Sequence, residues 1–286
     1  MAENANQSPV MFRRRLRAEL RRARSDAGLT QDQVAQEMDW SLSKVIRIEK
    51  GTSNISKNDL EAVFRLYKIT DPRRESELIE LSRAARKPSW WSSYKDIAPN
   101  ELIEFVEYES AASVIWNFEP QLIPGLLQTE DYARAAIRRF SVGRDVDKLV
   151  ELRMRRHEIL GRDDAPSLNI VIIEEVAHRG VGGKDIMLAQ LRHLIDLAGR
   201  PDVTIEVIPY QAGVHPGMHS PFVIHQYEEE RDDDVLYVES PLGDLIIRDN
   251  EKEIGSYRDR FQDLRDLSLG PDASSTFLAE IAGQLK

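Results

Sequence analysis

Residues 29–51 of this chain have the sequence LTQDQVAQEMDWSLSKVIRIEKG. Thr30 and Gln33, three positions apart, match a capping box, in which each side chain satisfies a backbone amide at the start of a helix. The match predicts a helix over residues 31–38. Asp39 follows at a position that favours a left-handed backbone, which aspartate tolerates better than most residues other than glycine. A short helix that ends in a tight turn is therefore expected.

A second short helix is predicted directly after this turn. Ser41 is suited to cap it, and residues 42–50 form it before Gly51 ends it. The two helices share an apolar side formed by Val34, Ala35, Val45 and Ile48. Ala35 is small, which suits the point where the two helices approach closely. Two helices arranged in this way can place the second one in the major groove of DNA.

Three more helices flank the pair. An arginine-rich helix is predicted over residues 10–27, with Gly28 as its C-terminal glycine. Ser56 opens a fourth helix that runs through Tyr67, and a fifth is expected over residues 73–86. The prediction for this part of the chain is an all-α domain of five helices.

Composition divides the chain into three parts. Residues 1–9 are small and polar, and we predict a disordered tail there. Residues 10–87 hold the five helices. A break in composition follows at Lys87-Pro88-Ser89-Trp90-Trp91, so residues 88–286 are predicted to form a second domain.

The net charge of −10 is unevenly distributed. Residues 1–87 contain 18 Lys and Arg against 13 Asp and Glu, whereas residues 88–286 contain 21 against 36. The distribution favours a basic nucleic-acid-binding module joined to an acidic partner. The alternative is that the acidic part only keeps the protein soluble. The absence of cysteine excludes disulfides and thiolate chemistry.

The stretch that opens this section resembles the Cro/CI (XRE) family of helix-turn-helix repressors, and the resemblance extends over residues 13–67. The matching residues are Leu29-Thr30-Gln31-x-x-Val34-Ala35 and Ser41-x-Ser43-Lys44-Val45-x-Arg47-Ile48-Glu49-x-Gly51. Asp39 stands where the family usually has glycine. The resemblance implies a five-helix Cro/CI-type domain that binds double-stranded DNA.

In this motif the amino end of the second helix faces base edges. Arg47 is the best suited to a base contact, because its guanidinium can bond O6 and N7 of guanine together. Ser43 can bond either base type and Leu42 can contact a thymine methyl, whereas Gln31 is expected on a phosphate. The predicted DNA-binding residues are Gln31, Ser41, Leu42, Ser43, Lys44 and Arg47. The alternative for each cation is a solvated helix surface.

The resemblance also pairs Arg24 with Glu49 as an internal ion pair, which would make both residues structural. Arg24 is the last of seven arginines between Arg13 and Arg24. These arginines can supplement phosphate binding and steepen its salt dependence. The sequence does not select among them.

The second domain is predicted to be mixed, so that the whole chain is α+β. Its last three strands are close in sequence, which favours an antiparallel sheet. The predicted strands are 112–118, 168–173, 203–209, 221–227, 235–239 and 245–247, and the helices are 100–110, 129–140, 146–161, 184–199, 250–268 and 272–284. The charge run 228–234 is expected to be a solvated loop between two strands.

This part of the chain resembles the uncharacterised domain that follows the helix-turn-helix in many actinobacterial XRE regulators. The resemblance covers most of residues 95–285 and rests on the stretches FEPQLIPGLLQT at 118–129, Ile208-Pro209, Pro221-Phe222 and Tyr237-Val238-Glu239. Such regulators are often paired with a small neighbouring protein and described as antitoxin-like.

We find no catalytic set in the second domain. His215 and His219 lack a third metal ligand at a suitable spacing, and Glu174-Glu175 with His178 is better explained as a charged helix start. The stretch 120–128 is apolar but rich in turns, so it can line a pocket or an interface, or pack in a core. Neither a metal, a cofactor nor an enzymatic activity is expected.

The sequence therefore favours a transcriptional regulator, expected to act as a dimer on two half-sites about one helical turn apart. The alternative is an antitoxin-like adaptor that binds a small partner protein and uses DNA binding for autoregulation. The start MAENANQSPV lacks the features of a secretory signal, and no apolar run is long enough to span a membrane. We expect a cytoplasmic protein without a membrane partner, associated with the nucleoid when bound to DNA.

Overall fold

The computed structural model describes residues 9–49, 53–141, 143–227, 234–240, 243–248 and 250–285. The chain divides into two compact units, the first ending at Ser92 and the second beginning at Ser93. The predicted boundary between residues 87 and 88 remains a prediction. The predicted tail lies outside the described residues except for Pro9, which begins the first helix.

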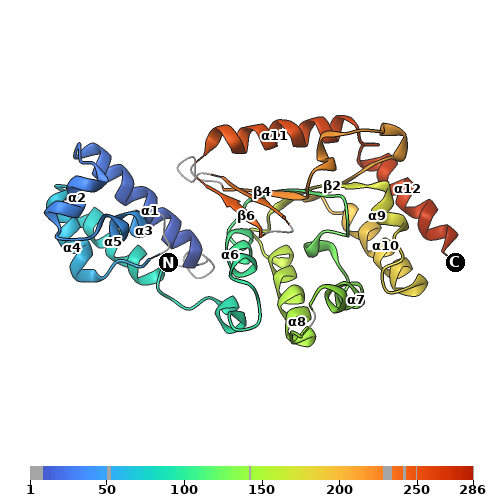
Figure 1. The fold of residues 1–286 in the computed structure, drawn as a ribbon, viewed down its shortest axis with the longest axis horizontal. Coiled ribbons are helices and arrows are strands. Elements are labelled where there is room, and N and C mark those ends of the chain that lie inside the picture. Colours follow the sequence, from blue (N-terminus) through green and yellow to red (C-terminus); the bar gives the residue numbers. More distant parts are fainter. Residues whose placement is uncertain are drawn as a thin grey trace. The chain divides into compact units, whose positions relative to one another are not determined.

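The first unit is formed by five α-helices, as the sequence predicts (Figure 1). They are α1 (Pro9–Asp26), α2 (Gln31–Glu37), α3 (Leu42–Glu49), α4 (Lys57–Leu66) and α5 (Pro72–Ala84). A short 3₁₀ helix, η1 (Trp90–Tyr94), follows them. The all-α, five-helix prediction is confirmed, with helix ends within two residues of the expected positions.

Local chemistry accounts for the turn between α2 and α3. The Thr30 hydroxyl accepts from the amide of Gln33 at 3.2 Å, and the Gln33 side chain accepts from the amide of Thr30 at 2.8 Å. The capping box is therefore complete. Asp39 has a φ of +51°, so the left-handed turn is also confirmed. Because α2 and α3 are both short, these end contacts matter more than intrinsic helix propensity.

A single apolar core holds the first unit together. The expected shared side of α2 and α3 is buried, with Val34 0% and Val45 2% exposed. Each fully buried aliphatic side chain contributes about 1.5–3 kcal/mol relative to exposure. The other buried residues of this core include Leu16, Leu20, Ile48, Ile55, Leu60, Val63, Phe64 and Leu78.

The second unit contains a six-stranded sheet with the order β3-β2-β1-β4-β5-β6. Its strands are β1 (Val114–Glu119), β2 (Ser167–Ile173), β3 (Val203–Ile208), β4 (Phe222–Gln226), β5 (Val235–Val238) and β6 (Leu245–Ile247). β4, β5 and β6 form the predicted antiparallel half. β1, β2 and β3 are parallel, and β1 is antiparallel to β4. The sheet is therefore mixed, and the sequence analysis foresaw only its antiparallel half.

Helices cover both faces of this sheet. α11 (Glu251–Asp266) lies along one face, where Phe261, Leu264 and Ile254 pack against Phe118 and Leu236 (Figure 1). The helices on the other side include α6 (Asn100–Glu109), whose Phe105 ring has its centroid 4.6 Å from that of the Tyr237 ring of β5. The remaining helices are α7 (Glu130–Phe140), α8 (Val146–Arg156), α9 (Glu174–His178), α10 (Lys184–Ala198) and α12 (Pro271–Gln284).

Short segments complete the unit. Four 3₁₀ helices connect the longer elements: η2 (Gly125–Leu127), η3 (His157–Gly161), η4 (Tyr210–Ala212) and η5 (Pro216–Met218). The predicted loop 228–234 lies outside the described residues except for Asp234, which is buried rather than solvated and pairs with Arg258. Within the described ranges, no helix combines the length and the apolar character needed to cross a membrane.

Candidate nucleic-acid interface

The amino-terminal part of α3 forms an exposed surface. Ser41, Leu42 and Ser43 are exposed, and Arg47 is exposed one turn further along. Residues 43 and 47 are four positions apart, so their side chains project from the same face of the helix. A large apolar side chain is also exposed in this patch, since Leu42 retains 38% of its surface.

The opposite side of α3 is fixed in the core. Val45, Ile48 and Glu49 are all buried, with exposed fractions of 2%, 8% and 5%. Because these three side chains cannot leave the core without exposing apolar surface or a paired charge, the rotation of α3 about its axis is determined. The face that carries Ser43 and Arg47 is thereby held outward.

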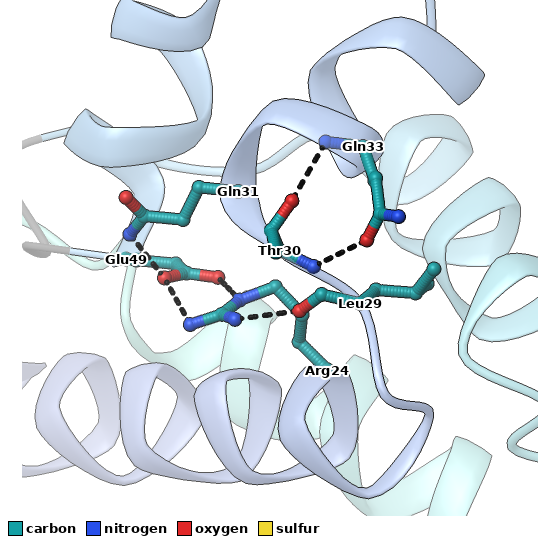
Figure 2. A network of polar contacts seen from close by, with 6 residues as sticks. All are labelled: Arg24, Leu29, Thr30, Gln31, Gln33 and Glu49. Carbon is teal, nitrogen blue, oxygen red and sulfur yellow. Dashed lines mark hydrogen bonds and ion pairs between the residues drawn. The ribbon is translucent and has the colours of Figure 1, made fainter.

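Glu49 is the centre of a polar network that joins three elements (Figure 2). Arg24 of α1 donates from Nε to Oε1 of Glu49 at 2.6 Å and from Nη2 to Oε2 at 3.2 Å. Its Nη1 donates to the carbonyl oxygen of Leu29 at 2.8 Å. The expected Arg24–Glu49 pair is confirmed, and it holds α1 against the end of α3 and the chain just before α2.

Gln31 belongs to the same network, which the sequence analysis did not anticipate. Its Nε2 donates to Oε2 of Glu49 at 2.7 Å. A carboxamide nitrogen carries two hydrogens, so one is used inside the domain and one remains. The expected phosphate contact of Gln31 is therefore restricted to that second hydrogen or to a rearranged side chain.

The network also sets the surroundings of Tyr67. Burial, followed by the negative charge of Glu49, raises the pKa of the Tyr67 hydroxyl to about 12. The phenol is therefore neutral at physiological pH. It adds no charge beside the Arg24–Glu49 pair.

Two other predicted contact residues are engaged within the domain. The Ser41 hydroxyl accepts from the amide of Lys44 at 3.2 Å, which confirms Ser41 as the cap of α3. Lys44 Nζ lies 3.1 Å from Oδ2 of Asp59 and 3.8 Å from the centre of the Trp40 ring. A phosphate would have to compete with Asp59 for this ammonium group.

The arginines of α1 do not form one cationic surface. Arg14 and Arg17 are buried, with exposed fractions of 3% and 6%, and Arg24 is held by Glu49. Arg15 and Arg22 are exposed. The number of phosphate contacts that α1 can add is therefore smaller than its seven arginines suggest.

Glu174, Glu175 and His178 of the second unit, which the sequence brings close together, bind several different partners. His178 lies 3.5 Å from Glu174, and Glu175 pairs with Arg179. Glu174 also accepts from the backbone amide of Tyr210 at 2.8 Å. Across the described part of the chain, no group of three or more acidic, histidine or cysteine side chains is arranged to hold a metal ion.

Two family models match the chain. One is described as a helix-turn-helix domain and matches residues 15–76, which include every predicted DNA-binding residue. The other is described as a domain of unknown function, DUF5753, and matches residues 102–280. No curated protein matches. No solved structure matches either.

Proposed function

The chain belongs to the DUF5753 family and carries a helix-turn-helix domain ahead of that domain, and from this premise we propose that it is a sequence-specific transcription regulator whose α3 enters the major groove of DNA. The observation that carries the proposal is the exposed face of α3. Ser43 and Arg47 share that face, while the opposite face is anchored by buried side chains and the Arg24–Glu49 pair.

Base contacts are assigned to the exposed side chains of this face. Arg47 bonds O6 and N7 of a guanine, Ser43 bonds a neighbouring base, and Leu42 lies against a thymine methyl. These three residues have exposed side chains, in keeping with such contacts. The predicted effect of losing one good base contact is about 1–3 kcal/mol of discrimination.

Phosphate contacts are assigned to Gln31, Ser41 and Lys44. Gln31 offers its second amide hydrogen, Ser41 its hydroxyl hydrogen, and Lys44 an ammonium group shared with Asp59. Contacts of this kind position the domain without reading sequence. The positive balance of residues 1–87 supports attraction to DNA despite the acidic remainder.

We assign dimerisation to the second unit. A two-fold dimer would present two copies of α3 to half-sites about one helical turn apart. The DNA site would then be a palindrome or close to one.

Selection of bound sequences from a random duplex pool tests the proposal. The full chain should enrich one motif, with two inverted copies if it binds as a dimer. A matched selection with Arg47→Ala should enrich a motif that has lost preference at one base pair in each half-site. The control is Arg83→Ala, which removes the same charge from an exposed position on α5. Failure of the unmodified chain to enrich any motif at moderate salt would overturn the proposal.

One observation favours the second candidate, an adaptor for a small partner protein. Tyr210, Val214 and Met218 are large apolar side chains close in sequence, with exposed fractions of 57%, 89% and 63%. Several exposed apolar side chains in one short segment can mark a protein-binding surface. A stable complex with the product of a neighbouring gene, weakened by Val214→Ser together with Met218→Ser, would favour this candidate if no DNA motif is enriched.

A further inference from the structure

A hollow of about 180 Å³ opens on the face of the sheet that is turned away from α11. Its floor is a row of directly paired residues on three neighbouring strands: Asn117 of β1, Val223 of β4 and Tyr237 of β5. The alternate residues of the same strands, such as Phe118 and Leu236, belong to the core on the α11 side. The hollow therefore opens on the opposite face of the sheet from that core, of whose described residues only Phe222 also lines it.

Two carboxylates stand at one end of this floor. Glu119 is the last residue of β1, and Glu239 follows β5 directly. Glu119 lies two positions beyond Asn117, and Glu239 lies two positions beyond Tyr237. Because Asn117 and Tyr237 share one row of the sheet, the two glutamates share the next row on the same face, with β4 between them. Strands are spaced about 4.8 Å apart, which places the two backbones about 10 Å apart. Glutamate side chains can converge across that distance.

A guanidinium faces the same hollow from α8. Arg153 Nη1 donates to Oε1 of Gln128 at 2.7 Å, and both residues line the hollow. The neighbouring Arg156 is already neutralised, because Glu109 accepts from its Nε at 2.7 Å and from its Nη2 at 2.8 Å. Arg153 therefore differs from Arg156 in that its side-chain partner, Gln128, is uncharged.

Gly125 allows the two guanidiniums to approach this wall. A Cβ atom at position 125 would lie 3.0 Å from Nη1 of Arg153 and 3.1 Å from Nη2 of Arg156. Gly125 also accepts, through its carbonyl oxygen, from Nε2 of His157 at 2.9 Å. Burial lowers the pKa of His157 to about 4, so this ring is neutral and carries its proton on Nε2.

Charges of both signs thus face the hollow without being paired. Among the described residues, neither carboxylate nor Arg153 has an ion-pair partner within 4 Å. Burial, followed by the charge of Glu239, raises the pKa of Glu119 to about 8, so this carboxyl is mostly protonated at neutral pH and a bound cation would favour its ionised form. Burial lowers the pKa of Arg153 to about 10, which leaves it cationic at neutral pH. Glu119 and Arg153 are only partly exposed whereas Glu239 is exposed, so the first two carry the larger cost of a charge that lacks a counter-charge.

We propose that this hollow binds a small zwitterion of the free amino-acid class, with its ammonium group between Glu119 and Glu239 and its carboxylate on Arg153. A ligand with one charge would satisfy only one wall. The volume also limits the ligand, because it corresponds to about six water molecules at about 30 Å³ each. Phe105 and Leu122 provide apolar surface for the remainder of the ligand.

The site lies entirely within the second unit and gives the stretch 120–128 a defined role. The sequence left pocket, interface and core packing open for that stretch. Ile123 and Gly125 line the hollow, whereas Leu127 is fully buried. The stretch therefore forms one wall of a candidate ligand site and part of the core. This inference does not depend on the DNA-binding proposal.

Thermal unfolding and titration calorimetry of the full chain test the proposal. The probes are the twenty standard amino acids at millimolar concentration, with putrescine as a ligand that carries only positive charge and glutarate as one that carries only negative charge. At least one amino acid should bind at one site per chain and raise Tm, because a ligand specific for the folded state stabilises it. Putrescine and glutarate should not. No binding by any of the amino acids overturns the proposal.

Variants locate the binding. Glu119→Gln combined with Glu239→Gln, and separately Arg153→Gln, should each weaken the affinity by more than tenfold. The matched control is Glu280→Gln, an exposed carboxylate on α12 outside the hollow, which should change the affinity by less than twofold. Circular dichroism verifies that each variant is folded. Unchanged affinity in folded variants of the hollow would show that the amino acid binds elsewhere and would overturn the assignment.

Discussion

Glu49 of the first unit and Glu119 of the second are both carboxylates drawn back from solvent, but their partners differ. Glu49 is 5% exposed and receives three hydrogen bonds from Arg24 and Gln31. Glu119 accepts from the backbone amide of Gln121 at 3.0 Å and has no ion pair among the described residues. A satisfied carboxylate holds helices in place, whereas one without a counter-charge is suited to bind a ligand.

The same contrast applies to the two units. In the first, the internal Arg24–Glu49 charges are paired and the candidate contacts lie on the outside of α3. In the second, Arg156 and Glu109 form a buried pair beside a hollow that keeps charges of both signs apart. Substitutions at four positions, described in turn, give the tests.

Glu109→Ala should have the largest effect. The Arg156–Glu109 side chains are only 6% and 4% exposed, so the substitution leaves a buried guanidinium without its counter-charge. The free energy of unfolding of the second unit should fall by about 3–5 kcal/mol. Urea denaturation measures the loss, and hydrogen exchange should localise it to α6 and α8. A loss below 1 kcal/mol would mean that water reaches Arg156.

Glu49→Ala should have the next largest effect, in the first unit. Arg24 is 19% exposed and can be partly solvated when Glu49 is removed, so the expected loss is smaller, about 2–3 kcal/mol. Hydrogen exchange should rise in α2 and α3 but not in the sheet. Equal effects of Glu49→Ala and of Glu61→Ala, an i,i+4 surface partner of Lys57, would contradict the network's structural role.

Glu119→Gln should alter the pH dependence of stability. The folded pKa of about 8 lies above the ordinary value, so the folded chain retains a proton that the unfolded chain releases. This contribution is present at acidic pH and is lost as pH rises through 8. The variant should match the unmodified chain near pH 4 and have the higher free energy of unfolding at pH 8. Parallel pH profiles would show that Glu119 is well solvated.

Position 39 should give the smallest effect. The φ of +51° suits glycine, is tolerated by aspartate and is unfavourable for alanine. Asp39→Gly should therefore be more stable than Asp39→Ala by about 1 kcal/mol in thermal unfolding. The reverse order would mean that the turn relaxes when Asp39 is replaced.

The first unit was largely predictable because its determinants are local. Thr30 and Gln33 are three residues apart, and Asp39 adjoins the helix that it ends, so sequence spacing reveals both. The Arg24–Glu49 pair was implied by family resemblance. The Lys44–Asp59 ion pair was not foreseen, because it joins different helices across fifteen positions and no spacing rule connects them.

The second unit shows the limit of the same approach. Hydrophobic patterns located all six strands, but a pattern does not specify which strands become neighbours. The parallel pairing of β1, β2 and β3 was therefore missed. The hollow depends on that topology, because it joins Glu119, Arg153 and Glu239, which are dispersed over more than a hundred positions. Each of these residues alone resembles an ordinary surface charge.

The most direct test of the central claim compares Arg47→Ala with the unmodified chain on two DNA duplexes, the selected site and a random sequence of equal length. The account predicts a loss of about 1–3 kcal/mol on the selected site, relaxed preference at one base pair and a much smaller loss on random DNA. Equal losses on both duplexes would show that Arg47 contacts only phosphate, and would contradict the assignment of base recognition to the exposed face of α3.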